Sequence, residues 1–461
     1  MLFNSYSFIF VFLPLTLLVF FTLARKGLHK AGTASLVVAS LVFYAYWDIR
    51  YLPLLLLSMI FNYSMGSLLE KTRSKVHLFF ALLVDLGLLG YFKYMDFFLH
   101  SWNAAFDTAI PLPGIILPLG ISFFTFTQIA FLVDAYRGET KNYSFLYYSL
   151  FVTFFPHLIA GPILYHKDMI PQFKRAKHFV FSHKSFALGL TVFALGLFKK
   201  VVIADSLIPW VKPVFEQAGN VGFFEAWSGA LAYTFQLYFD FSGYSEMAIG
   251  LGLLLNLRLP LNFDSPYKSF SIIEFWRRWH MTLSTFLKRY LYIPLGGNRQ
   301  GQGKKMRNLM ITMLLGGLWH GAGWTYVIWG GLHGLYLVIN HTWRKFGVKL
   351  PKCLAWVVTF LAVVFAWVFF RAATVQDALA LVQTMLGFKG IDFAGLQQLV
   401  GGKTEVLALM GLLLFVAKCP NVGEFVSRFR PNWQWAVLVS LVLVVSLLQL
   451  THVTEFLYFQ F

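Results

Sequence analysis

The chain has 461 residues, of which 58% are hydrophobic and only 13% are charged. Soluble domains carry about 25% charged residues, so this composition excludes an ordinary soluble protein and predicts that lipid surrounds most of the chain. Lys and Arg outnumber Asp and Glu by 38 to 20, which gives a net charge of +18. Basic segments between apolar runs are explained by membrane orientation and anionic lipid, without a nucleic-acid partner.

Apolar stretches of spanning length recur along the whole chain. The first covers residues 5–24, and its basic residues, Arg25, Lys26 and Lys30, follow it instead of preceding it. A cleaved signal peptide carries its positive charge first, so we expect a retained helix with its N-terminus outside. Further apolar stretches lie near residues 34–47, 51–69, 76–92, 114–134, 143–164, 186–204, 226–256, 308–320, 323–341, 353–370, 404–417 and 433–450.

Some of these stretches are too short to cross a hydrocarbon core alone. We therefore expect an all-α, polytopic integral membrane protein with about 11 transmembrane helices and additional re-entrant or interfacial helices. Residues 308–320 are one candidate for a re-entrant segment or half-helix. The expected organisation is one membrane domain, with N-terminal helices in 1–136, a catalytic core in 137–345 and C-terminal helices with an aromatic tail in 346–461.

The charge pattern predicts part of the topology. The basic segments 25–30 and 70–75 fit inside loops, with 48–51 outside between them. Basic residues flank 143–164 on both sides and cannot all be inside if that segment crosses once. Either one flank is misassigned or the segment is re-entrant. These flanking residues are Arg137 and Lys141 on one side and Lys167, Lys174, Arg175 and Lys177 on the other.

Residues 257–307 form the most basic stretch between two apolar runs. Helical spacing over 271–291 predicts an amphipathic helix with Trp276 on one side and Arg277 and Arg278 on others. An interfacial helix is the simplest interpretation. The same basic rim could hold the phosphates of a nucleotide-bearing donor.

Two histidines, His280 and His320, lie where a charged imidazole is costly. His280 follows the run EFWRRW, and His320 ends the apolar run MLLGGLW. Apolar surroundings favour the neutral ring, which a general base requires, so both are catalytic candidates. They are separated by 40 positions and can meet only through the tertiary fold. A structural histidine bonded to a backbone carbonyl is the alternative for each, and His333 could orient either ring or serve packing alone.

A second polar cluster lies within the apolar run 226–256, at Asp240, Ser242, Tyr244 and Glu246. Carboxylates in such a run must be paired, hydrated or protonated. They could line a substrate tunnel or partner a histidine, and a buried ion pair between helices is the equal alternative. Asn262 is interpreted as architectural. The two isolated cysteines, Cys353 and Cys419, indicate neither a metal site nor a disulfide framework.

Five motifs in order along the chain resemble those of the membrane-bound O-acyltransferase family, and in particular its alginate O-acetylation branch. The motifs are Pro118–Phe126 (PLGISFFTF), Asp240–Ser245 (DFSGYS), Glu274–His280 (EFWRRWH), Tyr292–Gly297 (YIPLGG) and Gly317–Gly321 (GLWHG). Their joint pattern covers nearly the whole chain and is more specific than any single motif.

The resemblance implies tilted helices around a central tunnel, with acyl-CoA entering from the cytosol as donor and no bound cofactor. His320 matches the principal catalytic histidine of the family, Trp319 lies beside it in the motif, and His280 matches the second functional histidine. The tail Phe456–Phe461 is similar to an aromatic-tyrosine terminus found in this branch and in the small accessory peptide of teichoic-acid D-alanylation, where the tyrosine is thought to carry the acyl group. Tyr458 is therefore a candidate acyl relay, and an interface anchor if taken alone.

The expected function is transfer of an acyl group, with acetyl favoured, across a bacterial cytoplasmic (inner) membrane to an extracytoplasmic polysaccharide. The expected partners are membrane lipid, acetyl-CoA and a periplasmic or extracellular acyltransferase protein that passes the group to the glycan. Two alternatives remain: a transporter or flippase of a lipid-linked glycan, and an acyltransferase whose acceptor is a lipid. The sequence does not distinguish alginate from cellulose, peptidoglycan or another polymer.

Overall fold

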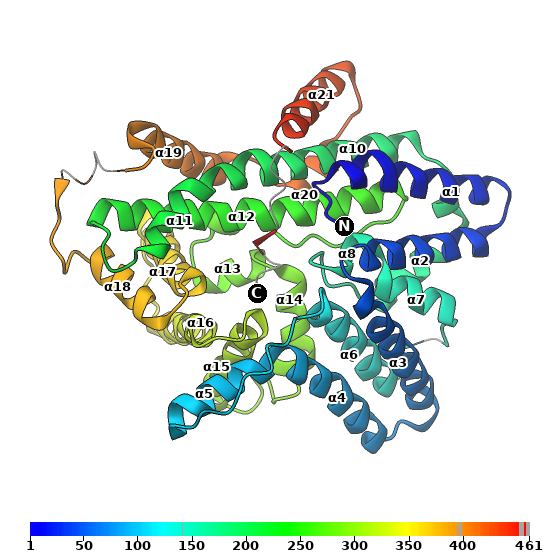
Figure 1. Cartoon of the computed structure of the whole chain (residues 1–461), viewed down its shortest axis with the longest axis horizontal. Helices are drawn as coiled ribbons and strands as arrows, with labels where there is room; N and C mark the ends of the chain where they lie inside the picture. The colour runs from blue at the N-terminus through cyan, green and yellow to red at the C-terminus, as the bar shows by residue number, and fades with distance from the viewer. Residues whose placement is uncertain (141, 394, 396–398, 451–455, 458–461) are drawn as a thin grey trace. The chain divides into compact units, whose positions relative to one another are not determined.

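Every regular element in the described part of the chain is a helix, as the sequence predicts (Figure 1). The computed structural model describes all residues except 141, 394, 396–398, 451–455 and 458–461. The α-helices are α1 (Leu13–Arg25), α2 (His29–Ala45), α3 (Leu52–Thr72), α4 (Lys75–Leu89), α5 (Met95–Phe106), α6 (Ile121–Arg137), α7 (Phe145–Thr153), α8 (Phe155–Leu158), α9 (His166–Phe173), α10 (His183–Phe198), α11 (Ile208–Glu216), α12 (Phe223–Leu254), α13 (Ile272–Arg278), α14 (Met281–Leu287), α15 (Gln302–His320), α16 (Trp324–Trp343), α17 (Lys352–Arg371), α18 (Val375–Met385), α19 (Gly402–Lys418), α20 (Val422–Arg428) and α21 (Trp433–Leu448).

Several helical runs are long and apolar enough to cross a membrane. Within the described residues these runs are Ser7–Arg25, Ile49–Thr72, Lys75–Phe106, His183–Glu216 and Lys352–Arg371. The helices α19 and α20 meet at an angle of 53° and form a sixth crossing if they act as one broken span. The predicted all-α, multi-pass architecture is therefore confirmed, whereas the figure of about 11 spans stays a prediction.

The described chain divides into two compact units, both discontinuous in sequence. Unit 1 contains Met1–Leu197, Tyr244–Pro260 and Phe429–Phe459, and unit 2 contains Phe198–Gly243, Leu261–Arg428 and Gln460–Phe461. The helix α12 contributes residues to each unit. Both histidines that the sequence singles out, His280 and His320, belong to unit 2.

In unit 1, the segment 143–164 folds back on itself. The helices α7 and α8 have nine and four residues and break at Phe154, so neither can cross a hydrocarbon core. Its two flanks meet, because Lys167 pairs with Glu139 at 3.4 Å and buried His166 contacts Asp134 at 3.1 Å. Of the two alternatives that the charge pattern leaves open, the structure favours the re-entrant segment.

In unit 2, the single amphipathic helix expected over 271–291 is wrong. The helix α13 begins with a cap in which the Ser271 hydroxyl accepts a hydrogen bond from the Glu274 amide, and it ends at Arg278. His280 then has a left-handed backbone conformation, with φ of 43°, and α14 begins at Met281. Helical spacing continues across this break, so periodicity in the sequence does not reveal it.

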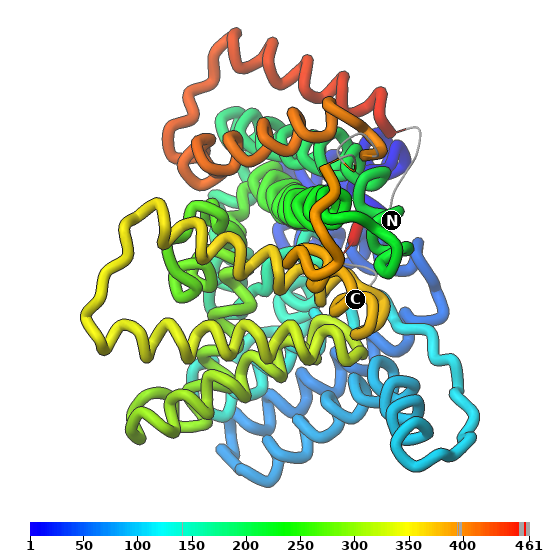
Figure 2. Tube along the Cα trace, turned by 90° about the vertical axis from the view of Figure 1, so that its left-hand side faces the viewer, coloured from blue at the N-terminus to red at the C-terminus, as the bar shows by residue number. Residues whose placement is uncertain are grey.

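The helices α15, α16 and α17 of unit 2 lie side by side (Figures 1 and 2). Glycines let the first two approach closely: a Cβ at Gly317 would lie 3.0 Å from the Gly330 Cα and overlap the Tyr326 carbonyl oxygen. Small residues permit such backbone contact between membrane helices. The close approach fixes the C-terminal end of α15, where His320 is the last residue.

We expect Gly317→Ala to separate α15 from α16 and to lower the stability of the detergent-solubilised protein by about 1–3 kcal/mol, since overpacking a tight contact strains it. Thermal unfolding measures the change. Gly303→Ala is the matched control on the same helix, because no atom lies within 4 Å of a Cβ there. Equal unfolding temperatures for the two variants would contradict the packing role of Gly317.

Candidate functional site

The fold of unit 2 brings His280 and His320 together. The centroids of the two imidazole rings are 6.2 Å apart. His280 is fully buried, and His320 is 5% exposed. The tertiary fold therefore makes neighbours of two buried histidines from distant motifs, while their catalytic roles stay a prediction.

The unusual backbone of His280 is held by Asn262. The backbone carbonyl of Asn262 accepts the Met281 amide at 2.9 Å, and its side-chain oxygen accepts the Thr282 amide at 3.3 Å and the Thr282 hydroxyl at 2.9 Å. These bonds satisfy the first amides of α14, which has no cap from its own N-cap side chain. A left-handed non-glycine residue costs about 1–3 kcal/mol, and the bonds to Asn262 offset that cost.

The same contacts fix the tautomer of His280. The Thr282 amide can only donate, so the Asn262 atom that it contacts is the oxygen. His280 Nδ1 lies 3.0 Å from this oxygen and must donate to it. A neutral His280 ring therefore carries its proton on Nδ1 and has its lone pair on Nε2, as a base requires. His280 lies between two short helices outside the spanning-length runs, and burial lowers its pKa to about 3.

Aromatic rings surround His320. Trp319 and Trp329 each lie 5.0 Å from the His320 ring by centroid, and Phe370 lies 5.3 Å away. Trp319 is also 6.2 Å from His280, so it borders both histidines as the motif suggests. This apolar wall favours a neutral ring and keeps competing water away from it.

His333 does not bond to either histidine among the contacts of the described residues. Its Nδ1 accepts the Trp276 indole N–H at 3.2 Å, which leaves the proton of a neutral ring on Nε2. Its ring lies 4.9 Å by centroid from Trp329, which in turn contacts His320. His333 and Trp276 thus support the aromatic wall behind His320.

Asp240 is held by a buried ion pair. Its carboxylate lies 2.7 Å from the ammonium group of Lys200, which also contacts Asp205 at 2.8 Å. The structure therefore supplies the ion-pair alternative for this residue, and its role in a tunnel stays a prediction. Phe241 packs edge-on against His280 at 4.8 Å, and buried Ser242 follows it on α12.

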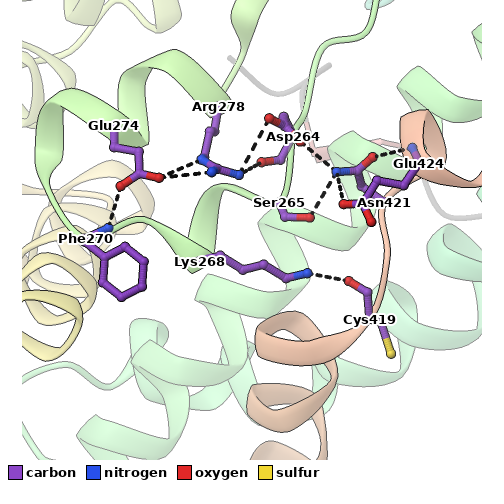
Figure 3. Close-up of polar contacts among 9 residues, drawn as sticks. All are labelled: Asp264, Ser265, Lys268, Phe270, Glu274, Arg278, Cys419, Asn421 and Glu424. Carbon is purple, nitrogen blue, oxygen red and sulfur yellow. Dashed lines mark hydrogen bonds and ion pairs between the residues drawn. The ribbon is translucent and has the colours of Figure 1, made fainter. Parts of the chain in front are cut away.

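Of the two predicted donor-binding arginines, Arg278 has carboxylate partners. Its guanidinium contacts Glu274 at 3.0 Å and donates to the Asp264 carbonyl at 3.0 Å, within a polar cluster that extends to Asn421 (Figure 3). Arg277 is exposed. Arg277 is thus the better placed of the two to meet a phosphate from solvent.

For the two predicted tyrosines, a role in the site stays a prediction. Tyr244 belongs to unit 1, where its buried ring stacks on Phe3 at 4.8 Å and contacts Phe456 edge-on at 4.4 Å. Phe456 is fully buried, so the aromatic tail begins inside unit 1 and not at its surface. Tyr458 lies outside the described residues.

Two residues that hold the site, Asn262 and Lys200, are not among the functional residues that the sequence predicts. The sequence indicates only an architectural role for Asn262, because no continuous helix joins it to His280 and no local pattern reveals their contact. Lys200 did carry a signal, because a lysine in the apolar run 186–204 needs a buried partner. Within the described residues, no cluster of three or more His, Cys, Asp or Glu side chains could hold a metal ion.

Comparison with known proteins confirms the resemblance seen in the motifs. The membrane-bound O-acyltransferase family model matches residues 10–375. The chain is 45% identical over 432 residues to a peptidoglycan O-acetyltransferase of Helicobacter pylori, covering 86% of this chain and 82% of that protein. It is 44% identical over 431 residues to a probable alginate O-acetylase of Pseudomonas aeruginosa (90% and 81% covered) and 40% identical over 502 aligned positions to one of Pseudomonas putida (all of both chains covered).

We expect His280 and His333 to show opposite tautomers in the 15N NMR spectrum of histidine-labelled protein. His280 should carry its proton on Nδ1 and His333 on Nε2, because an acceptor faces the first Nδ1 and a donor faces the second. The His280 signal should stay neutral from pH 8 to pH 5, since its pKa of about 3 lies below this range. Asn262→Ala should change the His280 signal and leave His333 unchanged, and identical tautomers would contradict the assignment.

We expect Lys200→Met to lower the stability of the protein by about 3–5 kcal/mol, because it leaves the buried Asp240 carboxylate without its cation. Thermal unfolding in detergent measures the loss. Lys212→Met is the control, since Lys212 and Glu216 are both more than half exposed and 3.8 Å apart. A loss no greater than in this control would show that the Lys200 pair contributes little.

Proposed function

This chain belongs to the membrane-bound O-acyltransferase family, and we propose that it takes an acyl group, with acetyl preferred, from cytosolic acyl-CoA and passes it across the membrane for O-acetylation of an extracytoplasmic polysaccharide. The observation that carries the proposal is the pair of buried rings, His280 and His320, 6.2 Å apart. The relatives named peptidoglycan O-acetyltransferase and probable alginate O-acetylase support peptidoglycan or an alginate-like exopolysaccharide as the polymer.

His320 is the proposed general base, and His280 positions or polarises a reactant. As the acceptor hydroxyl attacks the thioester carbonyl, His320 takes its proton, a C–O bond forms and the C–S bond breaks. The leaving thiolate then recovers a proton from the imidazolium and departs as CoA. Positioned general-base catalysis accelerates such a step by roughly a hundredfold to ten-thousandfold. The neutral ring that the base needs is the form favoured by its apolar neighbours.

Only the acyl group needs to cross the membrane in this scheme. Acyl-CoA stays on the cytosolic side of a bacterial inner membrane, and about 11 spanning helices surround a tunnel that the donor opens toward His320. The exposed Arg277 is the proposed contact for its phosphates. A periplasmic or extracellular acyltransferase partner then delivers the group to the glycan, because the polysaccharide itself remains outside.

Tyr458 is the proposed first acceptor. A phenol titrates near 10 and is mostly protonated at pH 7, so it requires a base before it attacks. Without the Tyr458 hydroxyl, the thioester should still be cleaved when another acceptor is present. The acyl group should then not be delivered to the outside.

We expect purified His320→Ala to lose roughly a hundredfold to ten-thousandfold of acyl-CoA turnover, measured as release of free thiol. The control is His100→Ala, which removes an exposed histidine on α5. Asn262→Ala should lose activity through its effect on His280 and serves as a second, indirect variant. Unchanged turnover in His320→Ala would remove the assignment of the base.

We expect Tyr458→Phe to abolish acylation of the external acceptor when the protein is reconstituted with its partner in proteoliposomes supplied with radiolabelled acetyl-CoA. The substitution keeps the aromatic ring and removes only the hydroxyl. Phe459→Leu is a control that changes the same tail without touching the phenol. Wild-type levels of transfer in Tyr458→Phe would remove the acyl relay.

A further inference from the structure

Unit 1 contains a polar cavity that the proposed acyl transfer does not use. Its volume is about 690 Å³, and its lining includes four cationic side chains against the single carboxylate of Asp168. The four cations are those of Lys167, Arg175, Lys177 and Arg258. A concave site with this excess of positive charge attracts anions and concentrates them.

The walls of the cavity are built by side chains that cross-link the backbone. The Gln172 amide group donates to the Arg258 carbonyl at 3.1 Å and accepts the Arg258 amide at 2.9 Å. His178 Nδ1 donates to the Asn256 carbonyl. The segment 256–258 is thereby fixed to α9 and to the 3-10 helix η4 (Ala176–Phe179), so the cations of both flanks are held around one space.

The N-terminus of α10 adds a fixed partial positive charge. Ser182 and Ser185 line the cavity where this 16-residue helix begins. The Ser182 hydroxyl accepts the Ser185 amide at 3.3 Å. The first amides of a helix and its macrodipole favour phosphate and similar anions at this end.

His178 provides an independent sign of a missing ligand. This cavity-lining residue is 7% exposed, and its Nε2 atom is buried without a hydrogen-bond partner among the described residues. Burial lowers the pKa of His178 more than its hydrogen bond to Asn256 raises it, and the nearby charges of Lys177, Arg175 and Arg258 lower it further. A bound anion would stabilise the protonated imidazolium against these charges, and Nε2 would then donate a hydrogen bond to it.

The cavity lies beside a loop that the positive-inside rule assigns to the cytosol. The ring of Phe179, the residue after His178, stacks on His29 at a centroid distance of 4.4 Å. His29 follows Arg25 and Lys26 in the first basic loop. Because α10 also starts the apolar run His183–Glu216, the positive-inside rule predicts that the cavity lies where a spanning helix meets the cytosolic surface.

We propose that this cavity binds the phosphate group of an anionic molecule at the cytosolic membrane surface. The source is either the phosphodiester headgroup of an anionic phospholipid or a soluble phosphate ester. The cytosolic leaflet presents such headgroups to basic clusters, and each cation near the surface strengthens that attraction. The site goes beyond the proposed acyl transfer, because it is built entirely from unit 1 and includes neither histidine of the candidate active site.

The test uses the purified full chain and two probes. Native mass spectrometry measures retention of phosphatidylglycerol against phosphatidylcholine, and calorimetry measures binding of adenosine 3′,5′-bisphosphate. The variant Arg175→Gln with Arg258→Gln removes one cation from each flank and should weaken phosphate binding about tenfold or more. The control, Lys174→Gln with Lys184→Gln, removes the same charge from neighbouring residues that do not line the cavity and should bind nearly as wild type.

Each outcome decides the proposal. Selective retention of phosphatidylglycerol identifies a lipid, and binding of the bisphosphate identifies a soluble ester; either supports the site when only the cavity variant loses it. Equal losses in the variant and the control, or no preference for phosphate-bearing anions over neutral phosphatidylcholine, overturn it. Arg175→Lys with Arg258→Lys keeps both charges and should bind better than the Gln pair. The unfolding temperature of every variant confirms that the fold is intact.

Discussion

The contacts of Asn262 are the constraint on which the candidate active site depends. The backbone and side-chain oxygens of Asn262 satisfy the first two amides of α14 and hold His280 in a left-handed conformation that the backbone does not favour by itself. The side-chain oxygen also orients the imidazole and determines which nitrogen carries the proton. Asn262, which belongs to neither α13 nor α14, thus fixes both the start of α14 and the protonation of a fully buried imidazole ring.

Surroundings poor in water explain why other polar groups are arranged in pairs. Lys200 lies between two carboxylates, Asp205 and Asp240, because a charge in such surroundings must be neutralised by the protein. The packing of α15 against α16 depends on a different feature, the absence of side chains at Gly317 and Gly330. The ion pair with Lys200 holds α12, which carries Asp240. The close backbone contact with α16 holds α15, which carries His320.

The basic residues have several different roles, and the net charge of +18 does not show which residue has which role. Arg278 is held by carboxylates in a structural cluster, whereas Arg175 and Arg258 surround a cavity of about 690 Å³. Lys167 joins the two flanks of a re-entrant segment through Glu139. Whether a basic residue serves packing or ligand binding therefore depends on the carboxylates and backbone groups near it, and not on its positive charge alone.

The sequence by itself determined that lipid surrounds this protein, that it is helical and which family it belongs to, because composition, apolar runs and short motifs are local properties of the chain. It also singled out His280 and His320. Only the tertiary structure decided that these rings are neighbours, that 143–164 turns back and that 271–291 breaks at His280. Those features depend on contacts such as His280 with Asn262, Lys167 with Glu139 and Lys200 with Asp240, between residues that no continuous helix joins, so local periodicity does not reveal them.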